Sequence, residues 1–212
     1  MKKVIVLQIV FLLCGFCIVQ AQNTDTTDVG VVINGVKWAT RNVDEFGTFA
    51  KNPYDAGKFY QWNRKKAWNG AAKELEDWRY FPREYLCESS EWEKDNDPCP
   101  KGWRVPTVKQ MYHLLGNTDN MWISDYNGSG VAGRVFTDGS QELFFPAAGR
   151  CAFFDNGSEY KVGKEGEYRS STSAPDNSGE YYSYVYYLSF STYIGVYRNS
   201  FGDGNSVRCV AE

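Results

Sequence analysis

The chain has 212 residues, a formal net charge of −3 and one histidine. Domains that bind nucleic acid need a basic surface, so we expect this mildly acidic chain to bind neither nucleic acid nor anionic membranes. Aromatic residues make up 17% of the chain and glycines number 20, while long amphipathic helical patterns are scarce. This composition predicts an α+β, β-rich fold with one or two short helices, long loops and an aromatic core.

Residues 1–21 are typical of a secretory signal peptide. Two lysines precede an apolar run from Val4 to Val19, and Val19-Gln20-Ala21 matches the small-residue cleavage pattern. Cys14 and Cys17 lack the preceding small residues that a lipoprotein signal needs, which makes lipidation the weaker alternative. We therefore expect an exported protein, whether periplasmic, held at the cell surface or secreted, with no membrane span in its mature chain.

The rest of the chain is predicted to form a polar leader and one domain. Residues 22–28 lack apolar anchors and predict a flexible leader, so the single domain is expected over residues 29–212. Its first element is a hairpin. Val31-Val32-Ile33 and Val36-Lys37-Trp38 flank Asn34-Gly35, a pair that suits the type I′ turn of a two-residue β-hairpin loop.

The stretch from Pro98 to Thr107 holds the densest set of structural signals. Its three prolines favour an extended backbone, and Thr107 with Gln110 spells a Thr-x-x-Gln capping box for a helix over residues 107–115. Gly116 is expected to end that helix in a left-handed conformation.

The predicted apolar face of this helix carries Val108, Met111, Tyr112 and Leu115 at helical spacing. His113 falls on the opposite face. A lone imidazole without a partner is most often a solvated surface residue, so we assign it no catalytic or metal-binding role.

Glycine-rich turns and short strands are predicted after the helix. A loop is expected to begin at Trp122, and Asp125–Gly130 reads D-x-N-x-S-G, the first half of a calcium loop. The twelfth position of such a loop should be an acid but is Phe136, so a turn is favoured over an ion site. Two strands are expected around the turn at Asp138-Gly139-Ser140.

Further strands are predicted toward the C-terminus. They cover Tyr168–Thr172, Tyr181–Phe190 and Tyr193–Tyr197, and Ser206–Val210 is predicted as a terminal strand tied down by a cysteine.

Five aromatic residues are the candidate ligand-binding side chains. Trp68, Trp78 and Trp92 belong to a charged, aperiodic excursion over residues 65–97, and long loops of this kind are usually functional or mobile. Tyr182 and Tyr184 lie in the tyrosine-rich strands. The alternative is structural, because tyrosines that alternate along a strand also fill cores.

Four cysteines remain after the predicted signal: Cys87, Cys99, Cys151 and Cys209. An even number in an exported protein indicates two disulfides, with three connectivities open. There is no C-x-x-C pair and no Cys/His cluster, so we expect no metal site and no cofactor.

Four motifs in order resemble a known family. They are Asp97-Pro98-Cys99-Pro100-Lys101-Gly102-Trp103-Arg104-Val105-Pro106-Thr107, Leu143-Phe144-Phe145-Pro146-Ala147-Ala148-Gly149-Arg150, Ser170-Ser171-Thr172 and Ser206-Val207-Arg208-Cys209-Val210. Together they resemble the major paralogous domain family first named from Fibrobacter succinogenes, a family of exported bacterial proteins. That family is distantly similar to the C-type lectin-like fold of the sulfatase-modifying enzymes.

The resemblance implies a mixed or antiparallel C-type lectin-like fold whose terminal strand returns beside the early strands. It also implies that Cys99 pairs with Cys209, which leaves Cys87 for Cys151. The activity of the sulfatase-modifying branch does not carry over, because its closely spaced reactive cysteines are absent here. The calcium and sugar tripeptides of true lectins, Glu-Pro-Asn and Trp-Asn-Asp, are absent too.

Three functions compete on this basis. The favoured one is a non-catalytic exported binding module that recognises glycan or protein at the bacterial surface. The first alternative is a structural or adhesive surface component that assembles with its own copies. The second is an extracellular hydrolase, for which a pair such as Glu91 and Glu93 would have to be buried and correctly spaced. No G-x-S-x-G, H-E-x-x-H or phosphate-loop motif supports that role, so we do not expect an enzyme.

Overall fold

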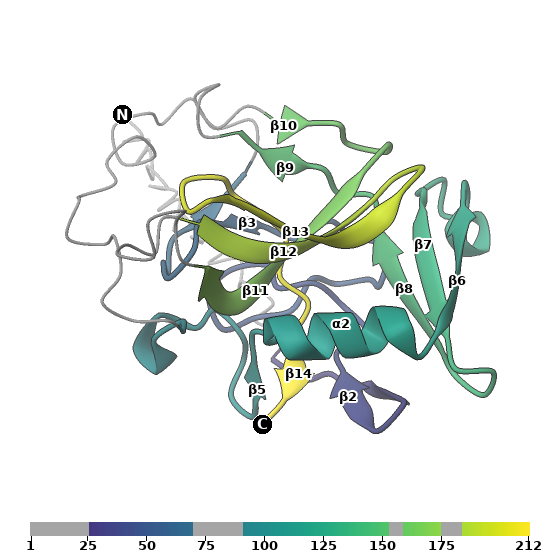
Figure 1. Cartoon of the computed structure of the whole chain (residues 1–212), viewed down its shortest axis with the longest axis horizontal. Helices are drawn as coiled ribbons and strands as arrows, with labels where there is room; N and C mark the ends of the chain where they lie inside the picture. Colours follow the sequence, from purple (N-terminus) through teal and green to yellow (C-terminus); the bar gives the residue numbers. More distant parts are fainter. Residues whose placement is uncertain (1–25, 70–90, 153–158, 175–183) are drawn as a thin grey trace, which may run out of the picture.

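Small antiparallel sheets pack around one α-helix in the described part of the chain (Figure 1). The structure is a computed structural model, and it describes residues 26–69, 91–152, 159–174 and 184–212. This arrangement confirms the predicted β-rich α+β class. The elements in chain order are β1 (Val31–Ile33), β2 (Val36–Trp38), β3 (Phe59–Tyr60), β4 (Ala67–Trp68), η2 (Lys94–Asn96), β5 (Trp103–Arg104), α2 (Val108–Gly116), β6 (Asp119–Ile123), η3 (Tyr126–Gly128), β7 (Gly133–Thr137), β8 (Glu142–Pro146), β9 (Arg150–Cys151), β10 (Glu159–Tyr160), β11 (Gly166–Ala174), β12 (Tyr184–Phe190), β13 (Ile194–Ser200) and β14 (Val210–Ala211).

The first sheet joins the two ends of the domain, in the order β1-β2-β14-β5. Its hairpin is confirmed: β1 and β2 pair antiparallel, and Asn34 and Gly35 have φ values of 47° and 81°, the left-handed backbone that a type I′ turn requires. β14 pairs with β2 on one side and β5 on the other, so the terminal strand does return beside the early strands.

The regular part of the terminal strand is shorter than predicted. Before β14 the chain makes single backbone bonds to several neighbours: Val207 O accepts from Val43 N, and Cys209 O accepts from Ala39 N. These contacts satisfy the backbone without forming a continuous ladder, because the partner segment is itself irregular.

Helix α2 begins as predicted. Thr107 Oγ1 accepts from Gln110 N, and the Gln110 side chain accepts from Thr107 N, which completes the capping box. The buried residues of the helix are Met111 and Leu114, whereas Tyr112 is 54% exposed. The predicted apolar face was therefore rotated too far toward Tyr112. The helix packs against β11, β12 and β13, and these contacts decide which of its residues are buried.

The end of α2 differs from the prediction. Gly116 keeps a helical conformation, and Asn117 is the C-cap with φ −127°. Asn117 Nδ2 donates to His113 O and lies 3.1 Å from His113 Nδ1, while His113 Nε2 lies 3.0 Å from Asn34 O. A neutral imidazole protonated at Nε2 satisfies both contacts. His113 is exposed, as predicted, but it links the helix to the hairpin turn.

Two three-stranded antiparallel sheets, β6-β7-β8 and β11-β12-β13, complete the core. The predicted strands on either side of Asp138 are confirmed as β7 and β8. Strand β6 was missed, since a loop was expected from Trp122. Between the sheets lies an aromatic cluster in which Phe145 contacts Phe136, Tyr168 and Phe190. Trp38 joins it from β2.

Neighbouring residues of strand β11 point into different environments. Tyr168 faces the aromatic cluster, whereas the buried Glu167 carboxylate accepts from Arg150 and, at 2.9 Å, from Asn205 Nδ2. Burial raises the pKa of Glu167, and the neighbouring Arg150 opposes that shift. The fold thus holds an ion pair where sequence patterning indicated only a strand.

The disulfide predicted from the family resemblance is present: Cys99 and Cys209 are bonded, with Cα atoms 6.1 Å apart. The second predicted pair is not supported at its described end, because Cys151 is a buried free thiol. Burial raises its pKa to about 12, so the thiol is protonated and unreactive at neutral pH. Cys87 lies outside the described residues.

The D-x-N-x-S-G segment is a turn. Asp125 Oδ1 accepts from Gly130 N at 2.7 Å, so the aspartate closes its own loop. Within the described residues, no group of three or more His, Cys, Asp or Glu side chains is placed to hold a metal ion. None of the helices in the described ranges has the length and hydrophobicity needed to cross a membrane.

Candidate functional site

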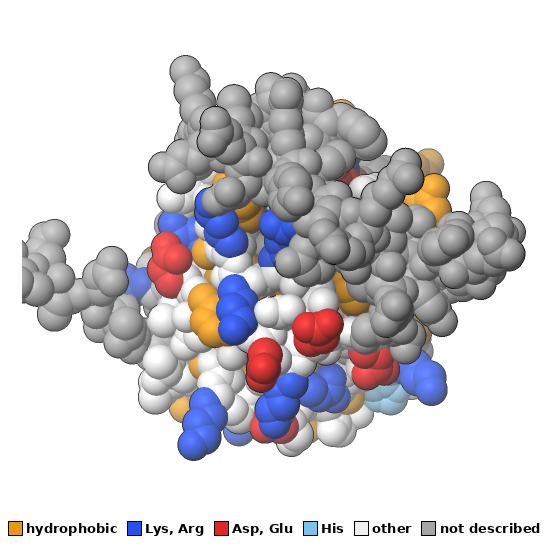
Figure 2. All heavy atoms as spheres, turned by 90° about the vertical axis from the view of Figure 1, so that its left-hand side faces the viewer, with side chains coloured by type: hydrophobic (Ala, Val, Ile, Leu, Met, Phe, Trp, Pro, Cys, Tyr) orange, Lys and Arg blue, Asp and Glu red, His pale blue; other side chains and the backbone are white. Residues whose placement is uncertain are grey.

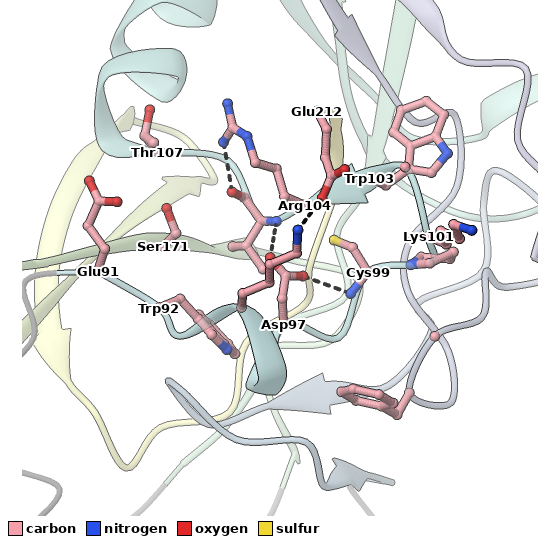
Figure 3. A pocket seen from close by; sticks show the side chains of 16 residues that line it. Glu91, Trp92, Asp97, Cys99, Lys101, Trp103, Arg104, Thr107, Ser171 and Glu212 are labelled. Atoms are coloured by element: carbon pink, nitrogen blue, oxygen red, sulfur yellow. Dashed lines mark hydrogen bonds and ion pairs between the residues drawn. The ribbon is translucent and has the colours of Figure 1, made fainter.

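A cleft with a volume of about 800 Å³ lies beside the central loop, Pro98–Thr107 (Figure 3). Its lining combines three aromatic residues, three basic residues and three acidic residues. They are Phe46, Trp92 and Trp103, then Lys94, Lys101 and Arg104, then Glu91, Asp97 and Glu212. We call this site the central cleft.

Asp97 holds the central loop in shape. Its Oδ1 accepts from Cys99 N at 2.9 Å and its Oδ2 accepts from Val105 N at 3.0 Å, so one carboxylate joins both arms of the loop (Figure 3). Burial raises the pKa of Asp97, although these two hydrogen bonds oppose the shift. Because both oxygens are occupied by backbone amides, Asp97 serves the loop and is a poor candidate for acid–base chemistry.

A tight turn forms the tip of the loop. Trp103 N donates to Pro100 O at 3.0 Å, and Gly102 has φ 85°, a conformation that glycine adopts without strain. Glu212 N donates to Gly102 O. The disulfide at Cys99 anchors the other arm. The loop is therefore fixed at its base and at its tip.

The capping box also fixes a charged side chain of the cleft. Gln110 Oε1 accepts from Arg104 Nη1 at 3.0 Å, in addition to its bond to Thr107 N. Arg104 Nη1 also donates to Val105 O. The guanidinium is thus positioned by the first turn of α2.

The Ser170-Ser171-Thr172 motif joins the two walls of the cleft. Ser171 N donates to Pro106 O at 2.8 Å, and Ser171 O accepts from Trp92 N at 2.9 Å. Thr172 Oγ1 accepts from Val108 N at 3.2 Å, which gives α2 a second N-terminal cap. This strand segment therefore ties the loop, the helix and the Trp92 segment together.

The aromatic residues of the cleft are supported from behind. Trp92 is mostly buried, donates through Nε1 to Asn96 O at 2.9 Å and lies 5.9 Å from the Trp62 ring. Trp103 packs edge-on against Phe49, and Lys37 lies over its ring at 5.6 Å. Both indoles are held by neighbours while part of each borders the cleft.

The charges on this side of the protein are mixed. Over the described surface shown in Figure 2, basic and acidic side chains lie close together and neither sign forms a large patch. In the cleft itself, Lys94 and Glu212 approach to 4.0 Å, but both side chains are largely exposed and their pairing is weak. The lining therefore offers donors and acceptors, with no strong field of one sign.

The structure separates the predicted ligand-binding residues. Trp92 lines the central cleft. Trp68 is buried in a different cluster, with Phe59, Ala148 and Cys151, which is the position of a core residue. Tyr184 is exposed at the start of β12 and does not line the cleft. Trp78 and Tyr182 lie outside the described residues.

Lys101, Trp103 and Arg104 were missed as site residues. They stand in the most distinctive motif of the sequence, where the same signals were interpreted as structural. Of the carboxylate pair considered for hydrolysis, Glu91 lines the cleft, whereas Glu93 Oε2 accepts from Asn96 Nδ2 at 3.1 Å and does not line it.

Comparisons of the chain with models of known protein families, with curated proteins and with solved structures found no match.

Proposed function

We propose that the protein is a non-catalytic exported binding module, that it recognises a glycan or a protein at the bacterial surface, and that the central cleft holds the ligand. The observation that carries this proposal is the bracing of the cleft. The loop is anchored by a disulfide, by both oxygens of Asp97 and by two helix caps. A site that is already ordered loses little entropy on binding.

A saccharide is the ligand that the lining suits best. The volume lies within the range of small-molecule sites, and aromatic surface alternates with side chains that donate or accept hydrogen bonds. Indole rings cover the apolar face of a sugar, while Lys101 and Arg104 donate to its hydroxyl groups. A protein segment with both charged and apolar side chains is the second ligand class for the same cleft.

Catalysis is less well supported by the described residues. Asp97 is committed to two backbone amides, and the other two acids of the cleft, Glu91 and Glu212, come from different segments of the chain. A glycosidase needs two carboxyl groups placed on either side of the scissile bond. The cleft is therefore better suited to holding a ligand than to cleaving one.

A glycan array followed by titration calorimetry tests the proposal. We expect the wild-type chain to bind a subset of neutral or mixed oligosaccharides, and Trp103→Ala to weaken that binding about tenfold or more. Lys101→Ala should weaken it less, because an exposed amine contributes a single solvated bond.

Matched controls distinguish a binding defect from a folding defect. Tyr112→Ala removes an exposed aromatic ring from α2, and Lys51→Ala removes an exposed amine, both outside the cleft. Equal binding by Trp103→Ala and Tyr112→Ala would contradict the proposal. Capture of peptides alone would move the ligand to the protein class. Self-association on size exclusion without any ligand binding would favour the structural or adhesive alternative.

A further inference from the structure

A second, smaller groove lies at the meeting point of the two three-stranded sheets. Trp122 of β6 pairs directly with Arg134 of β7, so their side chains share one face of the sheet. The groove has a volume of about 440 Å³ and is lined by Trp122, Arg134, Gly163, Lys164, Ser191 and Thr192. None of these residues lines the central cleft. We call this site the Arg134 groove.

Arg134 is 9% exposed and has no acidic partner among the described residues. Its Nη1 donates to Asn120 Oδ1 at 2.6 Å and its Nη2 donates to Ser191 O at 2.9 Å, and both acceptors are neutral. Nε has no hydrogen-bond partner in the described part of the chain. Burial lowers the pKa of Arg134, but an arginine stays protonated at neutral pH. The groove therefore holds an uncompensated positive charge.

Burying a charge without a counterion costs free energy, so a ligand of opposite charge would be favoured beside it. Both hydrogen-bonded nitrogens of Arg134 carry a second hydrogen, for which the described residues provide no acceptor. Lys164, which is exposed, adds a second cation to the groove. The acid next to Lys164 in the sequence is Glu165. Its Oε2 pairs with Lys161 Nζ at 2.7 Å, and its Oε1 accepts from Ser189 Oγ at 3.3 Å. The local field of the groove is thus positive.

Trp122 supplies a flat apolar wall. Its ring packs edge-on against Phe190, with centroids 6.4 Å apart, and the residue is 38% exposed. The contact with Phe190 holds the indole in place, while its exposed part borders the groove. Ser191 and Thr192 add hydroxyl groups to the lining.

We propose that the Arg134 groove binds an anionic sugar ring. The carboxylate or sulfate of the sugar lies between Arg134 and Lys164, and the apolar face of the ring stacks on Trp122. The planar guanidinium suits both anions, since its parallel N–H groups match a pair of oxygens. This site is separate from the central cleft and does not depend on the function proposed there.

Titration of the full chain with a matched set of oligosaccharides tests this inference. The probes are a trisaccharide of galacturonic acid, its neutral methyl ester, a galactose oligosaccharide carrying sulfate, its unsulfated form and inorganic sulfate. We expect the two anionic sugars to bind and the two neutral sugars to bind about tenfold or more weakly. Inorganic sulfate alone should bind more weakly than the sulfated sugar, because it cannot stack on Trp122.

Variants assign the contacts. Arg134→Met and Trp122→Ala should each weaken binding of the acidic trisaccharide about tenfold or more, and Lys164→Ala should weaken it less. Met121→Ala is the matched control for Trp122: it changes the adjacent residue of the same strand, which is 62% exposed on the opposite face. Lys109→Ala is the control for Lys164. If Arg134→Met fails to fold, Arg134→Lys and the exposed Lys164 still test the charge.

Four results would overturn the inference. One is equal affinity for the galacturonic acid trisaccharide and its methyl ester. Another is an equal loss of binding from Met121→Ala and Trp122→Ala. The third is binding of inorganic sulfate as tight as that of the sulfated sugar, which would leave an adventitious ion only. Loss of anionic-sugar binding in the Trp103→Ala variant would also reassign that ligand to the central cleft.

Discussion

The central cleft and the Arg134 groove differ in how they are built. The central cleft is made by a loop, and a loop has no shape of its own, so a disulfide, a buried carboxylate and two helix caps hold it. In the Arg134 groove the backbone ladder of β6 and β7 fixes Trp122 opposite Arg134, and the other lining residues come from the turns before β11 and between β12 and β13. The two principal side chains of this groove are therefore placed by strand pairing, whereas the central loop is placed by a disulfide and side-chain hydrogen bonds.

The two sites also differ in charge. Lysine, arginine, glutamate and aspartate all line the central cleft, whereas the charged side chains of the Arg134 groove are both basic. A mixed lining suits a polar ligand of low net charge, and a lining of one sign selects for the opposite charge. If both proposals hold, the two sites select ligands of different charge.

Removing the disulfide should have the largest effect and should separate the two sites. Its cysteines are 110 residues apart, and closing a loop of this length is worth about 4 to 5 kcal/mol in the chain-entropy model. We expect the double variant Cys99→Ala/Cys209→Ala to lose roughly that much unfolding free energy, measured by urea denaturation. Ligand binding in the central cleft should fall, while anionic-sugar binding in the Arg134 groove should persist wherever the chain remains folded.

Cys151→Ala is the control for this experiment. A buried free thiol leaves only a small void when it is truncated, so we expect a loss of about 1 kcal/mol. A loss as large as that of the double variant would instead indicate that Cys151 is bridged to Cys87. An equal decrease of binding at both sites would contradict the idea that the disulfide braces only one of them.

Asp97→Asn should have the next largest effect. An asparagine has a single acceptor oxygen, so one of the amides of Cys99 and Val105 would face an NH₂ group instead of a carboxylate oxygen. Leaving a buried amide unsatisfied costs about 1–3 kcal/mol. Hydrogen exchange should locate the loss of protection at the central loop, with the amides of β6 and β7 unchanged.

The pH dependence gives this variant a second readout. Burial raises the pKa of Asp97 in the folded protein, so the folded state binds the proton more tightly than the unfolded state. The stability contribution of the carboxyl group is therefore fully present below its unfolded pKa of about 3.9, and it is lost as the pH rises through the higher folded value. The penalty of Asp97→Asn should shrink over that rise. A penalty that grows with pH would contradict the raised pKa.

The features that could be predicted from the sequence are those that depend on residues close together in the chain. The Asn34-Gly35 hairpin and the Thr107–Gln110 capping box depend on neighbours within a few residues, and both are confirmed. The Cys99–Cys209 pair is long-range and came only from the resemblance to a family. Strand β6 was missed because its sequence, Asp119–Ile123, lacks the β-branched alternation of a typical strand; pairing with β7 defines it.

The candidate sites show the same limit. Trp68 and Trp92 belong to one tryptophan-bearing segment, and only their tertiary surroundings place the first in the core and the second beside a cleft. Arg134 gave no signal at all, since an arginine in a strand is usually solvated. Its significance comes from burial and from the absence of an acidic partner among the described residues, neither of which a local pattern records.

Thr172→Val should have the smallest effect and is the sharpest test of the bracing around the central cleft. The change keeps the shape of the side chain but removes the oxygen that accepts from Val108 N, 64 positions earlier in the chain. The capping box at Thr107 remains, so we expect a loss of about 0.5–1.5 kcal/mol in unfolding free energy, as for one hydrogen bond, measured by urea denaturation. Because Thr172 also lies beside Ser171, which bonds to Pro106 and Trp92, ligand binding in the central cleft should weaken slightly while binding in the Arg134 groove stays unchanged.

Thr118→Val is a matched control, because Thr118 Oγ1 donates to Leu114 O at the other end of α2. If both variants change binding in the central cleft equally, the helix as a whole and not its second cap controls that site.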